Sequence, residues 1–343
     1  MKDLIKQETL VVRNNLDEIS FARPILLLLV VLYHAMAIHT GNWDLPEGVA
    51  VISVYKLIGR LSYAFMLESF VFVSGYVWAY QRETRGKKER FWKLCKKKFF
   101  RLLLPAVLFG ILYIFLFEPD KFSVMLLVEG PGHLWFLLML FECFIIGWCL
   151  LKLRLLSVWL LSLLFLVAVF RPSDLPLRMS YTLYYLPFFM LGYYVYLKFE
   201  VLKECLHLKH ILMFWVFFFV SYFSMVTLRQ WLILHISSAF LLGGAKTGCT
   251  IVYSLIGTYA LLCTAIYVTK KKSIPSWYIH AGGLCMGVYI FQQFVLEIVY
   301  YHSPIPTSVS NWFLPIVGFL LALIISLTLT SLIRYTKIGK MIL

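Results

Sequence analysis

Apolar runs of about 16 to 22 residues, separated by shorter polar segments, repeat along the whole chain of 343 residues. About 20 apolar residues in a helix span the hydrocarbon core of a bilayer, so each run predicts a transmembrane helix. The pattern predicts ten such helices, at 24–40, 61–80, 102–117, 134–151, 155–170, 182–199, 210–228, 251–268, 283–302 and 312–333. The stretch 231–242 is apolar but short, and we expect it to be a re-entrant or interfacial piece on the outer side.

The number of Lys and Arg residues is alternately high and low in successive predicted loops. With the N-terminus in the cytoplasm, the inner segments carry 25 of the 32 basic residues and the outer segments carry 7. Membrane proteins keep Lys and Arg on the cytoplasmic side of the bilayer. The sequence therefore predicts an all-α polytopic membrane protein of about ten transmembrane helices, with both termini cytoplasmic.

The composition agrees with a membrane protein, since 61% of the residues are hydrophobic and 14% are charged. We expect one membrane-embedded domain over 1–343, in which 1–20 is a cytoplasmic N-terminal segment, and no fused soluble domain. The net charge of +15 is explained by the topology, so no nucleic-acid partner is expected. The seven cysteines form no CxxC motif, and neither a disulfide framework nor a metal site is indicated.

Two polar residues in the first apolar run are the strongest candidates for function. Arg23 and His34 are eleven residues apart, which puts them on nearly the same helix face, about 16 Å apart along the axis. Polar residues at membrane depth are costly and usually functional, and a neutral imidazole can take a proton from a hydroxyl. A packing histidine and a snorkelling arginine are the alternatives.

The segment 82–101 carries ten cations and two acids, directly before a predicted helix. Clustered cations at the cytoplasmic membrane surface suit a polyphosphate ligand or anionic lipid headgroups. Lys98 and Arg101 are three residues apart, so both lie on one helix face near the membrane boundary. Most of the other cations are explained by membrane topology alone.

Further candidates lie near the outer side and within the second span. His133 and Trp135 stand at the outer mouth of the fourth predicted span, where they would meet an acceptor; an interfacial histidine and an aromatic belt are the alternatives. Glu68 and Glu142 are acids inside apolar runs, where burial demands pairing, protonation or a cavity. Glu68 either pairs with a cation or orients an imidazole, or it is a hydrogen-bonded structural acid.

An ordered set of motifs covers nearly the whole chain and resembles the acyltransferase-3 family of integral-membrane acyltransferases. The motifs are Arg23-x10-His34, Phe70-Val-Phe-Val-Ser-Gly-Tyr76, Lys98-x-x-Arg101 before Leu-Leu-Leu-Pro, Gly132-His-Leu-Trp-Phe136, Leu186-Pro-Phe-Phe-Met-Leu-Gly-Tyr193 and Gly287-Val-Tyr-Ile-Phe291. Members of that family have a ten-helix acyl-transfer domain. They modify sugars of surface polysaccharides, lipopolysaccharide or related envelope glycans, typically with acetyl from cytoplasmic acetyl-CoA.

The resemblance implies that Arg23 and His34 are the family's essential pair. It also implies that Lys98 and Arg101 stand at the family's Arg-x-x-Arg position, and that Glu68 is similar to the acid six residues before its Ser-Gly. Lys98 departs from this pattern and lacks the planar guanidinium for bidentate phosphate contact. A second departure lies after Tyr289-Ile-Phe, where Gln292 and Gln293 follow and many relatives have a histidine.

The resulting expectation is an O-acyltransferase of the bacterial inner membrane. Acyl-CoA, most simply acetyl-CoA, would dock its phosphates on Arg23, Lys98 and Arg101. His34, with Glu68 as a second catalytic residue, would transfer the acyl group to a hydroxyl of an envelope glycan or a lipid-linked sugar. His34 acts either as a general base or as a transient acyl carrier. The alternatives are a polysaccharide or lipid-glycan exporter without acyl transfer, and a membrane scaffold or sensor.

Overall fold

The computed structural model describes residues 16–173, 175–198 and 207–342, which form helices and loops and contain no strand. The longer helices are α1 (Asp17–Ala35), α3 (Ser53–Tyr63), α4 (Met66–Ala79), α6 (Leu104–Phe117), α8 (Trp135–Lys152), α9 (Val158–Val169), α10 (Met179–Leu197), α12 (Leu208–His235), α13 (Ala239–Lys271), α15 (Cys285–Tyr301) and α17 (Leu314–Tyr335). The shorter α-helices are α2 (Ala37–Thr40), α5 (Phe91–Lys98), α7 (Val124–Glu129), α14 (Ser276–Gly283), α16 (Ile305–Ser308) and α18 (Lys337–Ile342). Two π-helical turns, Tyr80–Thr84 and Phe99–Leu103, continue α4 and join α5 to α6.

Seven helical segments in the described part of the chain are long and apolar enough to cross a membrane. They are Asp17–Ala35, Ser53–Thr84, Phe91–Phe117, Gly132–Lys152, Leu208–His235, Ala239–Lys271 and Leu314–Tyr335. An eighth results if α14 and α15, which meet at 64°, together make one bent span. This count is lower than the predicted ten because α9 has only 12 residues and because six tyrosines lower the hydropathy of α10. All ten predicted segments are nevertheless largely helical.

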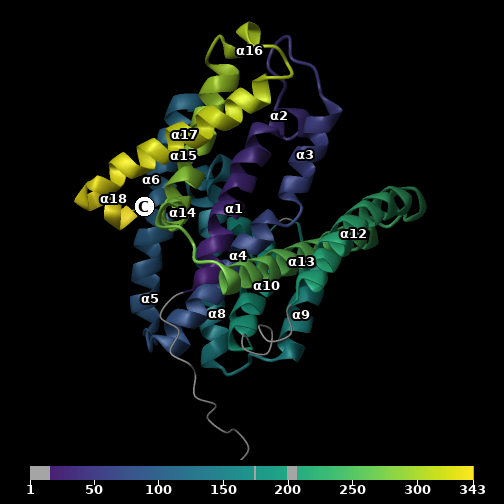
Figure 1. Ribbon diagram of the computed structural model, residues 1–343, viewed down its shortest axis with the longest axis vertical. Helices are drawn as coiled ribbons and strands as arrows, with labels where there is room; N and C mark the ends of the chain where they lie inside the picture. Colours follow the sequence, from purple (N-terminus) through teal and green to yellow (C-terminus); the bar gives the residue numbers. More distant parts are fainter. Residues whose placement is uncertain (1–15, 174, 199–206, 343) are drawn as a thin grey trace, which may run out of the picture.

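The structure contradicts a separate re-entrant piece at 231–242, whereas an interfacial position on the outer side stays a prediction. α12 continues to His235 and α13 begins at Ala239, so this apolar stretch is the adjoining ends of two long helices. The Ser238 hydroxyl caps α13 by accepting a hydrogen bond from the Leu241 amide. With 28 and 33 residues, the two helices are about 42 Å and 50 Å long and pack together as an arm that extends to the right in Figure 1.

Two glycines allow α4 and α10 to pack backbone against backbone. A Cβ atom on Gly75 would collide with the carbonyl group of Phe189, and one on Gly192 would collide with the carbonyl group of Phe72. Small residues at such positions let membrane helices approach closely. The motifs around Gly75 and Gly192 are therefore packing motifs that hold α4 against α10.

α1 lies among α3, α13, α14, α15 and α17 near the middle of the molecule (Figure 1). It begins earlier than predicted, at Asp17, and its first turn carries Asp17 and Glu18, which suit the positive end of a helix dipole. Arg23 is therefore in the second turn of the helix rather than before it. His34 lies in the last turn, so the same helix carries both candidate residues.

Candidate functional site

Two adjoining cavities lie inside the bundle, and between them they contain every predicted site residue except Glu68. The first, of about 430 Å³, contains Arg23, Lys98 and Arg101, and we call it the cation cavity. The second, of about 240 Å³, contains His34, His133 and Trp135, and we call it the imidazole pocket. Three residues line both cavities and form a shared wall between them: Leu67, Phe136 and Tyr289.

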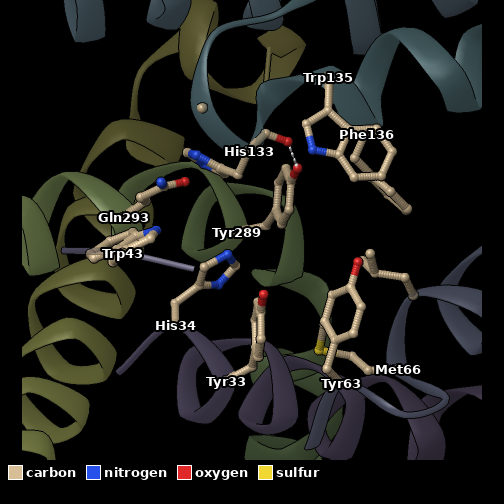
Figure 2. A pocket seen from close by; sticks show the side chains of 12 residues that line it. Tyr33, His34, Trp43, Tyr63, Met66, His133, Trp135, Phe136, Tyr289 and Gln293 are labelled. Atoms are coloured by element: carbon tan, nitrogen blue, oxygen red, sulfur yellow. Dashed lines mark hydrogen bonds between the residues drawn. The ribbon is translucent and has the colours of Figure 1, made fainter. Parts of the chain in front are cut away.

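The imidazole pocket is walled by aromatic and amide side chains (Figure 2). Its lining consists of Tyr33, His34, Trp43, Tyr63, Met66, Leu67, Gly132, His133, Trp135, Phe136, Tyr289 and Gln293. None of these residues carries a carboxylate, an ammonium or a guanidinium group. The rings of His34 and His133 face each other across the pocket with their centroids 6.2 Å apart. The structure thus brings together two histidines that are 99 positions apart in the sequence.

The His34 ring is held by hydrogen-bonding groups at its Nδ1 atom. Nδ1 lies 3.0 Å from the Val30 carbonyl oxygen, one turn earlier in α1, and 3.1 Å from the side-chain amide of Gln292 on α15. The ring projects into the pocket beside Tyr33 and Trp43 rather than outward (Figure 2). Because Nδ1 is engaged, Nε2 is the atom left for chemistry.

A tight turn carries His133 into the bundle. Gly130 and Gly132 adopt positive φ angles of 81° and 54°, and a Cβ on Gly130 would lie 2.6 Å from the Trp135 amide nitrogen. Glycine is needed where the backbone is both left-handed and this crowded. His133 is then fixed by its Nε2 atom, 3.1 Å from the Ile290 carbonyl, and by its own carbonyl, which accepts a hydrogen bond from the Tyr289 hydroxyl (Figure 2).

The cation cavity gathers positive side chains from three separate parts of the chain. Its charged lining residues are Arg23, Lys97, Lys98, Arg101 and Arg334. No carboxylate lines it among the described residues. The Lys98 ammonium lies 3.3 Å from the centroid of the Phe144 ring, so a cation–π contact holds it in the cavity. The structure therefore places Arg23, Lys98 and Arg101 in one cavity, and their role in phosphate binding stays a prediction.

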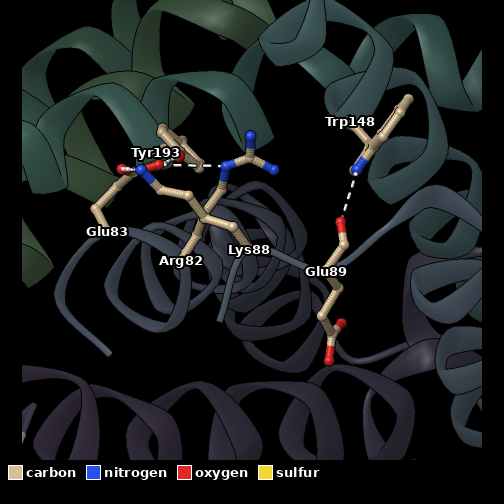
Figure 3. Close-up of polar contacts among 6 residues, drawn as sticks. All are labelled: Arg82, Glu83, Lys88, Glu89, Trp148 and Tyr193. Atoms are coloured by element: carbon tan, nitrogen blue, oxygen red, sulfur yellow. Dashed lines mark hydrogen bonds and ion pairs between the residues drawn. The ribbon is translucent and has the colours of Figure 1, made fainter. Parts of the chain in front are cut away.

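The two acids of the segment 82–101 are bound elsewhere (Figure 3). Glu83 pairs with Arg82 at 3.2 Å and with Lys88 at 3.4 Å, and it accepts a hydrogen bond from the Tyr193 hydroxyl. Glu89 pairs with Lys97 at 3.0 Å. Its backbone carbonyl accepts a hydrogen bond from the Trp148 indole at 3.2 Å.

These pairs divide five of the ten cations of the segment into two groups, although Lys97 also lines the cavity. Arg82, Lys88 and Lys97 have carboxylate partners, whereas Lys98 and Arg101 face the cavity without one in the part of the chain that the structure describes. Unneutralised cations in a cavity of this size can hold an anionic ligand by charge-assisted hydrogen bonds.

Glu68 lies apart from both cavities. Its side chain is 4% exposed, and one carboxyl oxygen accepts a hydrogen bond from the Tyr184 hydroxyl at 2.8 Å. It is not among the lining residues of either cavity, and no described hydrogen bond joins it to a cation or an imidazole. The geometry is that of the hydrogen-bonded structural acid, and its catalytic role stays a prediction.

Sequence reasoning missed several residues of the site. Arg334 closes the cation cavity from α17, where its guanidinium also donates to the Gly283 carbonyl at 2.8 Å. Arg334, like Arg23, stands at the end of an apolar run, and this position was the sequence signal for a cation at the same membrane boundary. Tyr289 and Gln292 had a weaker signal, since Gln292 is itself part of the departure from the family pattern and Tyr289 lies three residues before it.

The comparisons with known proteins agree with this geometry. A family model described as an acyltransferase domain matches residues 16–335, nearly the whole chain. Searches of curated proteins and of solved structures give no match. The matched region includes every residue of both cavities, and its apolar helices are long enough to cross a bilayer. The chain belongs to the acyltransferase-3 family and is a multi-pass membrane acyltransferase.

Proposed function

We propose that this protein transfers an acetyl group from cytoplasmic acetyl-CoA to a hydroxyl of an envelope or surface glycan. In this proposal the chain crosses a bacterial inner membrane ten times and both termini are cytoplasmic. The observation that carries the proposal is the arrangement along α1. Arg23 lines a cavity of cations, and His34, on the same helix, lines the adjoining pocket of neutral polar and aromatic groups.

The cation cavity suits the donor. CoA carries a 3′-phosphate and a pyrophosphate, and guanidinium and ammonium groups bind phosphates strongly where water is scarce. Arg23, Lys98, Arg101 and Arg334 provide four such groups without a carboxylate partner among the described residues. With the phosphates held there, the pantetheine arm leads the thioester toward the shared wall of the two cavities.

The imidazole pocket suits the acceptor and the chemistry. Aromatic side chains present flat apolar faces with polar edges, which match the faces and hydroxyls of a sugar ring. As a general base, Nε2 of His34 takes the hydroxyl proton while the sugar oxygen attacks the thioester carbonyl carbon. The carbon–sulfur bond then breaks, and the CoA thiolate recovers the proton from the ring.

A second route through the same nitrogen has His34 as the nucleophile. Nε2 attacks the thioester carbonyl carbon and displaces the CoA thiolate. The sugar oxygen then takes the acyl group from Nε2, the hydroxyl proton passes to the thiolate, and the ring returns to its neutral form. Both routes need an unprotonated Nε2 that faces the pocket. They differ in whether an acylated protein forms when acetyl-CoA is added without acceptor.

An exporter of polysaccharide or glycolipid would also have cavities in a helical bundle, but it has no reason to cleave a thioester. The experiment is therefore CoA release from acetyl-CoA by the purified protein in nanodiscs, supplied with envelope glycolipid. Mass spectrometry of surface glycans from cells with and without the gene accompanies it. We expect CoA release and a mass difference of one acetyl group. Glycan loss from the surface without CoA release would favour the exporter.

A matched pair of histidine variants completes this experiment. His235 resembles His34 locally, because it also lies in the last turn of a helix with Nδ1 near the carbonyl of the residue four earlier, at 2.8 Å. It lines neither cavity. We expect His34→Ala to abolish CoA release and His235→Ala to retain it. Equal activity of the two variants would remove His34 from the mechanism.

A further inference from the structure

The Nδ1 atom of His34 lies near one group that only accepts hydrogen bonds and one group that only donates them, and both cannot be bonded to it as they stand. Nδ1 lies 3.0 Å from the Val30 carbonyl oxygen, which only accepts, and 3.1 Å from the amide nitrogen of Gln292, which only donates. One nitrogen cannot donate to the first and accept from the second at the same time. Gln292 is completely buried, and its amide oxygen has no hydrogen-bond partner among the described residues.

The oxygen and nitrogen of a side-chain amide are assigned from the hydrogen bonds around them. Exchanging the two atoms of Gln292 removes the contradiction, since the unpartnered oxygen then lies beside Nδ1. A single Nδ1–H group donates to both the Val30 carbonyl and the Gln292 carbonyl oxygen. We infer that Gln292 is a positioning residue that keeps His34 in the tautomer protonated at Nδ1, so that Nε2 presents its lone pair to the pocket.

Among the groups around His34, an amide is the one that can fix the tautomer of the ring. The titratable groups that face the ring are Tyr33 from α1, Tyr63 from α3, His133 from the turn before α8 and Tyr289 from α15. No carboxylate, lysine or arginine is among the lining residues, so no charged partner orients the imidazole. A neutral amide oxygen can stabilise the Nδ1–H of a protonated ring without burying a second charge in the membrane interior.

The first test needs no enzymatic activity. Nitrogen NMR of the full-length protein with ¹⁵N-labelled histidine in nanodiscs distinguishes the two neutral tautomers, and comparison with His34→Asn assigns the signal of His34. We expect protonation at Nδ1 in the wild type and a larger share of the Nε2-protonated tautomer in Gln292→Met, in which only the Val30 carbonyl still accepts from Nδ1. A wild-type ring protonated at Nε2 would overturn the inference, even if acyl transfer itself is observed.

The second test is kinetic and depends on the proposed acyl transfer. Gln292→Met removes the acceptor with little change of volume, and we expect kcat to fall about 10- to 100-fold while KM for acetyl-CoA stays unchanged, because this is the effect of losing a hydrogen bond to a ring that becomes charged. Gln292→Glu keeps an accepting oxygen, so kcat should recover at least tenfold over Gln292→Met. Equal losses in these two variants, or an unchanged kcat in Gln292→Met, would overturn the inference.

The pH profile separates positioning from mere packing. A carboxylate at position 292 stabilises the protonated ring, so the acid limb of the kcat profile should move to higher pH in Gln292→Glu. Gln230→Met is the control, since Gln230 is an exposed glutamine on α12 that lines neither cavity, and its acid limb should stay in place. An unmoved limb in Gln292→Glu would contradict the inference. Wild-type protein without CoA release would contradict the proposed function alone, because the tautomer test still decides the role of Gln292.

Discussion

The cation cavity and the imidazole pocket differ in every property that matters for chemistry, although they share a wall. The cation cavity is nearly twice as large, about 430 Å³ against about 240 Å³, and five of its lining residues are basic. The imidazole pocket has no residue with a permanent charge and is walled by rings and amides. Charged groups and neutral polar groups are thus separated along one helix.

The separation has a physical reason. A fixed cation next to an imidazole disfavours the proton that a general base must accept. Leu67, Phe136 and Tyr289 stand between the two sets of residues, and they contribute bulk without charge. The cations can therefore hold phosphates strongly while His34 remains in a neutral environment. The predictions that follow test whether variants on the two sides of the wall affect different kinetic constants.

The largest expected effect is that of His34→Ala on turnover. A positioned general base contributes about 10²- to 10⁴-fold to a rate, so kcat should fall by that factor. Because the residue lies outside the cation cavity, the affinity for CoA should not change. Steady-state kinetics and calorimetric titration with CoA measure the two quantities. Lost CoA binding in this variant would contradict the division of roles.

On the other side of the wall, Arg101→Gln should act on donor binding. A charge-assisted hydrogen bond contributes about 1.5–3 kcal/mol, so KM for acetyl-CoA should rise about 10- to 100-fold with kcat nearly unchanged. Lys88→Gln is the control, because Lys88 pairs with Glu83 and does not line the cavity. We expect less than a twofold change in the control. Equal changes in the two variants would show that only total charge matters.

A smaller effect is expected for Arg334→Gln. This guanidinium also donates to the Gly283 carbonyl, so fewer of its N–H groups are free for phosphate, and KM for acetyl-CoA should rise about 3- to 10-fold. The double variant with Arg101→Gln measures whether both side chains hold the same ligand. An unchanged KM in Arg334→Gln would place Arg334 outside the donor site, and a non-additive double variant would show that the two side chains act on the same part of the ligand.

The sequence predicted the all-α class and six of the residues that line the two cavities, because the signals were local. Apolar runs identify helices, and the eleven-residue spacing of Arg23 and His34 fixes their common orientation on α1. The sequence of the 82–101 segment predicted a basic cluster but not which of its cations form ion pairs. Which cation pairs with Glu83 or Glu89 and which faces the cavity depends on three-dimensional packing.

The rest was hidden because it depends on contacts between distant helices. Arg334 reaches the same cavity as Arg23 across 311 positions of sequence, and Gln292 reaches His34 across 258. The boundary errors have a simpler cause, since hydropathy does not distinguish one apolar helix end from the next. The predicted spans 210–228 and 251–268 are therefore shorter than α12 and α13, and the predicted separate piece at 231–242 consists of the ends of these two helices.

Glu68 gives the smallest expected effect and the sharpest test of the resemblance against the geometry. Glu68→Gln keeps an oxygen that accepts from the Tyr184 hydroxyl, and the side chain lines neither cavity, so kcat should fall less than about threefold. Glu68→Leu leaves that buried hydroxyl without a partner and should lower the free energy of unfolding by about 1–3 kcal/mol, measured by thermal denaturation in nanodiscs. A loss of kcat in Glu68→Gln as large as that of His34→Ala, at unchanged stability, would instead make Glu68 part of the chemistry, and the imidazole pocket would then include a carboxyl group that this conformation keeps behind its wall.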